Sequence, residues 1–364
     1  MRTTLLGSIP SLAFLSSAAL LGGCALVAGY DFGRYSERTG EGGGSSTSAA
    51  TGTGGAAATA SSTGTGGGAP TTTVLHTGTD PPIALAVDAN AVYFTTGHAG
   101  MADGTLFRVE KDGSNHSALA GNLPFPDALA LDSTLMYAYW VANTAGKGTI
   151  RRILTDGGGV PELIFMPMER VGGLAFSSGT IYWTATESGY LFQNSKATGL
   201  DFIVSGQSFP GAIVTDNSNL YWVDRGNDGS SDGLVMKSDL AGKGATALAN
   251  GVNSPGQIAI NAASVHWCTL DGGVYAVLKN GMEEGFIYAP PKVPADPCSS
   301  LAADEAHVYF AKGSTVYRAL VGSSQAMPYV TDLEAPLKIA LDPTSLYVAG
   351  RDASGKGTVL KVPR

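Results

Sequence analysis

A motif that recurs seven times between residue 82 and the C-terminus constrains the fold more than any other feature of the chain. Each copy reads Pro-x-x-(Leu/Ile)-Ala-x-Asp, followed after a short turn by an aliphatic residue, Tyr and Trp or Phe, with a few substitutions. Successive copies are 38 to 45 residues apart. Repeats of this length with strand-like content are typical of a β-propeller, in which each repeat forms one blade. The acidic turn position of the seven copies is occupied by Asp88, Asp132, Ser177, Asp216, Asn261, Asp304 and Asp342.

Each copy of the motif predicts a β-hairpin. The short apolar run is a strand, and Asp or Asn then begins a tight turn by accepting hydrogen bonds from its own downstream backbone. A β-branched and aromatic run, such as Val92-Tyr93-Phe94, is the return strand. We therefore interpret the turn acids as structural and the aromatic pairs as core between blades, with His266 as a packed core residue at a Tyr position. A second hairpin follows in each repeat, so the sequence predicts four strands per blade.

The seventh repeat ends after its third strand, because the chain stops at Arg364. The segment Thr72–His76, which precedes the first repeat, resembles the fourth strands of the other repeats. We therefore predict an all-β, seven-bladed β-propeller over residues 74–364, with the ring closed by an N-terminal strand that pairs with the C-terminal blade. Closure would satisfy backbone groups that an open sheet edge leaves exposed.

The N-terminus reads as a targeting segment. Arg2 precedes an apolar stretch, and Leu21-Gly22-Gly23-Cys24 resembles the lipobox of bacterial lipoproteins. The resemblance implies a lipoprotein signal peptide over residues 1–23, cleavage before Cys24 and lipidation of that cysteine. The alternatives are an ordinary secretory signal or an uncleaved anchor helix.

Residues 24–73 contain the lipidated Cys24 and a linker rich in Gly, Ser, Thr and Ala, which we expect to be flexible because it has too little apolar surface to fold. Ala25 follows Cys24, and under the enterobacterial sorting pattern this favours the outer membrane. The sequence thus predicts an exported protein anchored to the cell envelope through lipid. It leaves open the periplasmic or the surface side.

Composition limits the partners. The net charge is −8 and no basic run is present, so we do not expect nucleic acid as a partner. We expect a monomeric propeller. Cys268 and Cys298 fall on the same face of the propeller in adjacent blades, and export implies an oxidising compartment, so a disulfide between them is predicted. The alternative is two independent buried thiols.

Candidate binding residues are few. The predicted axial rim, where the innermost strands begin, carries Asp127, Gln257 and Lys338 as its ligand-binding candidates. A long loop with Asp224, Asp228 and Asp232 partly imitates a calcium-binding loop, but Val235 stands where the acidic twelfth ligand belongs. A solvated loop is the alternative there, and no other cofactor is expected. The sequence has no GxSxG, no HExxH and no Cys/His spacing typical of a metal site.

The segments Tyr182-Trp183-Thr184 and Tyr221-Trp222-Val223-Asp224 resemble the signature of the Tyr-Trp-Thr-Asp propeller family, and TolB-like and NHL-type propellers share the Ala-x-Asp and Tyr-Trp/Phe pattern. The resemblance implies a rigid disc used mainly for binding. We therefore expect a lipid-anchored envelope protein that binds or scaffolds a protein or glycan through one propeller face. The alternatives are a hydrolase- or lyase-type propeller enzyme acting at the axial mouth, and a passive structural lipoprotein.

Overall fold

The computed structural model describes residues 70–364, except 145, 167–168, 196, 228–229, 283, 289–295 and 332. The predicted signal peptide, Cys24, the linker before residue 70 and Asp228 therefore lie outside the described residues. The described part of the chain forms 28 strands. No helix in this part is long and apolar enough to cross a membrane.

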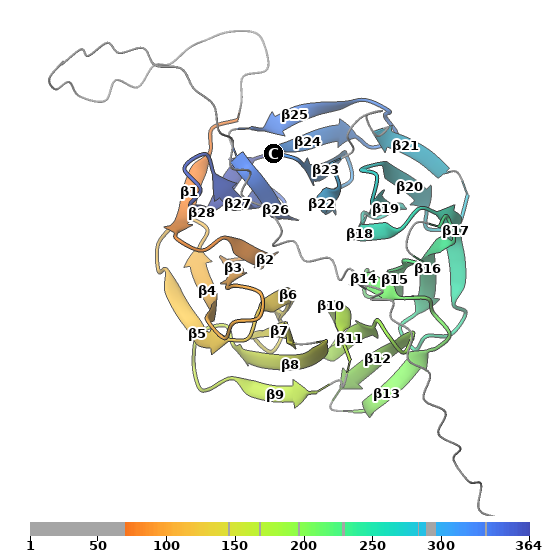
Figure 1. The fold of residues 1–364 in the computed structure, drawn as a ribbon, viewed down its shortest axis with the longest axis horizontal. Helices are drawn as coiled ribbons and strands as arrows, with labels where there is room; N and C mark the ends of the chain where they lie inside the picture. Colours follow the sequence, from red (N-terminus) through yellow and green to blue (C-terminus); the bar gives the residue numbers. More distant parts are fainter. Residues whose placement is uncertain are drawn as a thin grey trace, which may run out of the picture. The chain divides into compact units, whose positions relative to one another are not determined.

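The strands form seven antiparallel sheets of four strands each, arranged as blades around an axis (Figure 1). In blades 1 to 6 the chain passes through four consecutive strands from the innermost to the outermost. Blades 1 to 3 comprise β2 Pro82–Val87, β3 Ala91–Thr96, β4 Gly104–Glu110, β5 Ser117–Leu123; β6 Pro126–Asp132, β7 Tyr137–Thr144, β8 Lys147–Leu154, β9 Glu162–Phe165; β10 Val171–Ser177, β11 Thr180–Ala185, β12 Tyr190–Ser195 and β13 Gly199–Val204. Blades 4 to 6 comprise β14 Pro210–Thr215, β15 Asn219–Asp224, β16 Gly233–Asp239, β17 Thr246–Val252; β18 Pro255–Ile260, β19 Ser264–Thr269, β20 Val274–Leu278, β21 Glu284–Tyr288; β22 Cys298–Ala303, β23 His307–Lys312, β24 Thr315–Leu320 and β25 Ala326–Val330.

Blade 7 joins the two ends of the propeller. It consists of β26 Leu333–Leu341, β27 Ser345–Asp352, β28 Gly357–Pro363 and, outermost, the first strand β1 Thr73–Gly78. Strand β1 pairs antiparallel with β28, and the Thr358 hydroxyl donates to the carbonyl of His76 at 3.1 Å. Leu75 of β1 is buried between blades 7 and 1. The predicted seven-bladed, all-β architecture and its closure by an N-terminal strand are thus confirmed.

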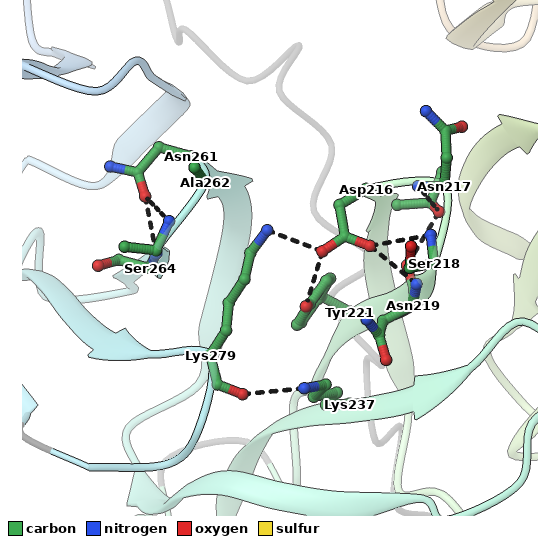
Figure 2. Close-up of polar contacts among 12 residues, drawn as sticks. Asp216, Asn217, Ser218, Asn219, Tyr221, Lys237, Asn261, Ala262, Ser264 and Lys279 are labelled. Carbon is green, nitrogen blue, oxygen red and sulfur yellow. Dashed lines mark hydrogen bonds and ion pairs between the residues drawn. The ribbon is translucent and has the colours of Figure 1, made fainter.

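The turn residues Asp88, Asp132, Asp216, Asn261, Asp304 and Asp342 act as the sequence predicts, as caps of the first hairpin in every blade except blade 3, which has Ser177. In blade 4, Asp216 Oδ1 accepts the backbone N–H groups of Ser218 and Asn219 at 3.0 and 2.8 Å (Figure 2). The second oxygen, Oδ2, accepts the Tyr221 hydroxyl at 2.9 Å. In this blade the Asp and the Tyr five positions later therefore stabilise each other. The same Asp–Tyr bond occurs in blades 1 and 7, between Asp88 and Tyr93 and between Asp342 and Tyr347.

Strand register explains the small residue of the motif. On the inner strand Ala86 stands opposite Tyr93, and Val214 stands opposite Tyr221, so the small side chain leaves room for the ring. The Tyr and the following Trp or Phe point to opposite faces of the blade because side chains alternate along a strand. Each of the seven hydrophobic clusters accordingly lies between two adjacent blades. His266 is fully buried in this layer, as predicted.

Candidate functional site

All seven innermost strands carry a β-bulge near their start. The register shifts by one residue directly after the first motif position in each of β2, β6, β10, β14, β18, β22 and β26. A bulge adds an unpaired residue and re-aims its side chain. The end of the ring axis at which these strands begin is called the axial mouth below. The predicted rim positions Asp127, Gln257 and Lys338 lie in or beside these bulges.

Side chains of neighbouring blades bind the carbonyl groups that the bulges remove from the strand ladders. The Thr95 hydroxyl donates to the carbonyl of Pro126 at 2.6 Å, and the Thr184 hydroxyl donates to the carbonyl of Gly211 at 2.7 Å. Ser299 makes the equivalent bond to Pro336 at 2.8 Å. Buried backbone groups without partners are costly, so these bonds stabilise the mouth in one conformation. They also tie each blade to the next.

Asp127 is the most extensively bonded of the predicted rim residues. Its two carboxylate oxygens accept the Asn143 side-chain amide at 3.2 and 3.0 Å. The same amide nitrogen donates to the carbonyl of Val171 at 3.0 Å, and Asn143 Oδ1 accepts the Val171 backbone N–H at 3.0 Å. Asn143 therefore fixes the orientation of the Asp127 carboxylate while it joins blades 2 and 3.

The mouth holds opposite charges. Burial raises the pKa of Asp127, while the bond from Asn143 and the positive charges of Arg170 and Lys338 act in the opposite direction. Burial lowers the pKa of Lys338, and the negative charge of Asp127 opposes this shift. Both side chains are half-buried, so the ring encloses them while part of their surface remains accessible. The structure thus brings together two rim residues from blades 2 and 7, which flank blade 1.

Gln257, the third rim candidate, is half-buried in the bulge of β18. Its side-chain amide makes no hydrogen bond within the described residues. It therefore presents a donor and an acceptor that the fold does not use.

The proposed calcium loop is only partly described, because Asp228 lies outside the described residues. Asp224 ends β15, is 3% exposed and accepts the Ser208 backbone N–H at 2.8 Å. Burial raises its pKa to about 6. Asp232 is occupied by its own loop, since its Oδ1 accepts the Asn227 backbone N–H at 2.9 Å and its Oδ2 accepts the Asn227 amide at 2.6 Å. Among the described residues no three His, Cys, Asp or Glu side chains are grouped to hold a metal ion, and calcium at this loop stays a prediction.

Cys268 and Cys298 are joined by a disulfide with a Cα–Cα distance of 6.0 Å. The bond connects the end of β19 in blade 5 with the first residue of β22 in blade 6. Both cysteines are buried in the cluster between these blades.

The histidines do not join the axial mouth. His98 bonds Asp103 at 2.8 Å, and His76 bonds His116 at 2.9 Å beside the closing strand. His266 is buried in blade 5, and His307 stands beside Asp304. No hydrogen bond or ion pair within the described part of the chain connects any of them to Asp127 or Lys338.

Comparison with known proteins identifies the fold but no family. No family model matches the chain, and no curated protein matches it. Among solved structures, virginiamycin B lyase from Staphylococcus aureus superposes with a TM-score of 0.62 at 15% identity, covering 78% of this chain and 95% of the lyase. A catalytically inactive variant of the same lyase with quinupristin gives the same TM-score and identity over 80% of this chain and 98% of the variant. The computationally designed protein Ika8 has a TM-score of 0.53 at 14% identity, over 79% of this chain and 98% of that chain.

A chain of the nidogen/laminin complex is also similar, with a TM-score of 0.50 at 18% identity, over 63% of this chain and 90% of that chain. At these identities the likeness shows the propeller fold alone. The function of this chain therefore has to be argued from its own residues.

Sequence reasoning located Asp127 and Lys338 but missed their surroundings. Asn143 ends a second strand, and no motif position marks it, although a polar residue at the end of an aromatic strand is the signal that could have identified it. Arg170 precedes β10 and has no counterpart in the repeat. The bulges were also missed, because one extra residue in an apolar run changes no periodicity that a single sequence reveals.

Proposed function

We propose that the protein is a lipid-anchored binding or scaffold protein of the bacterial cell envelope, and that the axial mouth recognises its protein or glycan partner. The observation that carries the proposal is the pair of opposite charges, Asp127 and Lys338, enclosed at the mouth beside Gln257. Polar groups held in one orientation lose little conformational entropy when a ligand binds. A mouth built in this way favours recognition of a polar partner.

Anchoring is supported by the lipobox-like segment that ends at Cys24, with the outer membrane as the favoured destination. The linker up to residue 73 would separate the propeller from the bilayer and let it reorient. Metabolic labelling with an alkyne fatty acid tests the anchor. The wild-type protein should take up the label and enter the membrane fraction, whereas Cys24→Ser should do neither. Label on the Cys24→Ser variant would contradict this assignment.

The binding role is tested by cross-linking in cells that express tagged, full-length protein, followed by mass spectrometry. The wild type should capture one reproducible envelope protein, and Asp127→Asn and Lys338→Met should each lose it. Asp112→Asn serves as the control, because it removes one exposed carboxylate from the β4–β5 turn on the opposite face. If no protein is captured, the same four proteins are applied to a glycan array. Equal capture or binding by all four would show that the mouth is not the recognition surface.

A second candidate function is a propeller enzyme of the hydrolase or lyase type at the same mouth. The specific observation in its favour is the pair of shifted groups, because burial moves the pKa values of Asp127 and Lys338 in the directions that suit acid–base chemistry. The fold neighbour virginiamycin B lyase supplies a first probe, since quinupristin is present in the structure of its inactive variant. Consumption of quinupristin by the wild type, abolished by Asp127→Asn, would favour this function over binding alone.

A further inference from the structure

A hollow lies between blades 4 and 5, on the face opposite the axial mouth. Its volume is about 590 Å³, which falls within the range of pockets that hold small ligands. It opens on the face that carries the β14–β15 and β16–β17 turns. These turns lie at the ends of the strands that are farthest from the mouth. The lining comes from the end of β16 with the turn after it, and from the β20–β21 turn of the next blade. We call it the blade 4–5 groove.

Three lysines and one carboxylate line the groove, in a protein whose net charge is −8. Lys279 is neutralised, because its ammonium lies 2.8 Å from Asp216 Oδ2 (Figure 2). Burial alone would raise the pKa of Asp216, but the bonds from Lys279 and from the turn N–H groups hold it well below its usual value. The acid of the lining, Asp239, caps its own turn by accepting the backbone N–H groups of Ala241 and Lys243 at 2.9 and 2.8 Å.

The other two lysines have no carboxylate partner within the described residues. Lys237 donates to the backbone carbonyl of Lys279 at 3.0 Å, which orients the ammonium without neutralising it (Figure 2). Lys243 is exposed on the turn between β16 and β17. Asn219 adds a side-chain amide to the lining, next to the hydroxyl of Tyr221. The groove therefore combines the positive charges of Lys237 and Lys243, which exceed the one negative charge of Asp239, with an amide that can donate and accept.

Comparison with blades 7 and 1 distinguishes the lysines that connect blades from the lysine that occurs only in the groove. Between blades 7 and 1, Lys361 donates to the carbonyl of Lys111 at 3.0 Å, and Lys111 pairs with Asp342 at 2.7 Å. This arrangement repeats that of Lys237, Lys279 and Asp216. The turn that carries Lys243 in blade 4 joins the third and fourth strands, whereas in blade 7 the fourth strand, β1, precedes blade 1 in the chain and no such turn joins it to β28. The shared lysines thus connect blades, and Lys243 adds the charge that is specific to the groove.

We propose that the blade 4–5 groove binds an anionic saccharide of one or two units, with its carboxylate or phosphate on Lys237 and Lys243 and its hydroxyl groups on Asn219. The volume limits the ligand to this size, and the two ammonium groups require the charge. The proposal is independent of the axial mouth, since no residue is shared and the two sites lie on opposite faces.

The test is isothermal titration of the full-length protein with glucuronate and with glucose 6-phosphate, against glucose and inorganic phosphate. Both charged sugars should bind, more weakly at high salt, and glucose should not. Lys243→Gln should weaken binding about two- to fivefold, because Lys243 is an exposed charge. Lys237→Gln should weaken it as well, whereas Lys361→Gln, which removes the equivalent bond between blades 7 and 1, should not.

Three outcomes would overturn the proposal. Charged sugars that bind no better than glucose would remove the role of the charge. Inorganic phosphate that binds as tightly as glucose 6-phosphate would remove the role of the sugar. A loss of binding in Lys361→Gln equal to that in Lys237→Gln would place the effect in blade packing. Variants of Asp127 should leave the titration unchanged, so failure here and failure of the mouth as a binding surface remain distinguishable.

Discussion

Single residues determine how firmly each hairpin is held. Tyr347 is fully buried and donates to Asp342 at 2.8 Å, whereas Tyr182 of blade 3 is equally buried but stands five residues after Ser177 instead of an acid. Burial and the Asp342 carboxylate raise the pKa of Tyr347, which keeps the hydroxyl protonated as a donor. Tyr347 and Tyr182 therefore occupy the same position of the repeat, and only Tyr347 has a charged acceptor for its hydroxyl group.

Tyr347→Phe should lower the free energy of unfolding by about 2 kcal/mol, because it removes a buried hydrogen bond to a charged group. Tyr182→Phe is the matched control and should change the free energy of unfolding by less than about 0.5 kcal/mol. Urea unfolding of the two variants measures the difference. Equal losses would show that the tyrosine hydroxyl contributes nothing through the turn acid.

His266 makes stability depend on pH. It is fully buried, neither ring nitrogen has a partner among the described residues, and burial lowers its pKa from 6.5 to about 4. The unfolded chain therefore binds a proton at a pH where the folded chain does not. The contribution to stability is complete above about pH 6.5 and is lost as the pH falls toward 4.

Between pH 7.5 and pH 5 the loss from this residue should be about 2 kcal/mol. His266→Phe should remove that part of the pH dependence while it keeps an aromatic ring in the core. His98→Gln is the control, because His98 is exposed at a loop. Urea unfolding at the two pH values decides the matter, and an unchanged pH dependence in His266→Phe would contradict the assignment.

At the scale of elements, the closing strand β1 completes blade 7, although it lies at the opposite end of the propeller sequence from β26, β27 and β28. Deleting residues 71–77 should expose the edge of β28 and the pocket of Leu75, and should lower the melting temperature by roughly 10 °C or more. Hydrogen exchange in β28 should rise at the same time. A synthetic peptide of residues 71–78 should restore both values. A truncated protein that melts like the full chain would show that β1 does not close the ring.

The strands and turns were predictable because the same hairpin motif occurs seven times in the sequence. Asp216 and Tyr221 could be assigned to a turn and a return strand from spacing alone. The positions of Cys268 and Cys298 relative to the turn residues of their repeats placed both at one face of neighbouring blades. The blade 4–5 groove could not be predicted, since Lys237 comes from a strand of blade 4, Lys243 from the turn after it and Lys279 from blade 5, and the motif does not include these positions. Ion pairs between blades depend on contacts between side chains that are distant in the sequence, and the repeat period does not indicate which side chains meet.

At the scale of the whole molecule, the ring is a chain of seven interfaces in which each blade packs only against its neighbours. Blades 3 and 5 depart from the motif at the positions that hold the first hairpin. Blade 3 has Ser177 in place of the Asp. In blade 5, Asn261 and His266 replace the usual Asp and Tyr, and Ala276 stands opposite His266 where Lys237 stands opposite Tyr221. Blade 5 therefore lacks the buried bond to a charged turn acid, and the disulfide to blade 6 supplies a covalent connection in its place.

The Cys268–Cys298 disulfide should accordingly stabilise the ring at blade 5. It closes a loop with a sequence separation of 30 residues, for which chain entropy predicts about 3–4 kcal/mol. Cys268→Ala with Cys298→Ala should lower the free energy of unfolding by that amount, and hydrogen exchange should rise first in β18 to β21. Reductant should lower the stability of the wild type and leave the double variant unchanged. If exchange instead rises evenly around the ring, blade 5 is not the element that opens first.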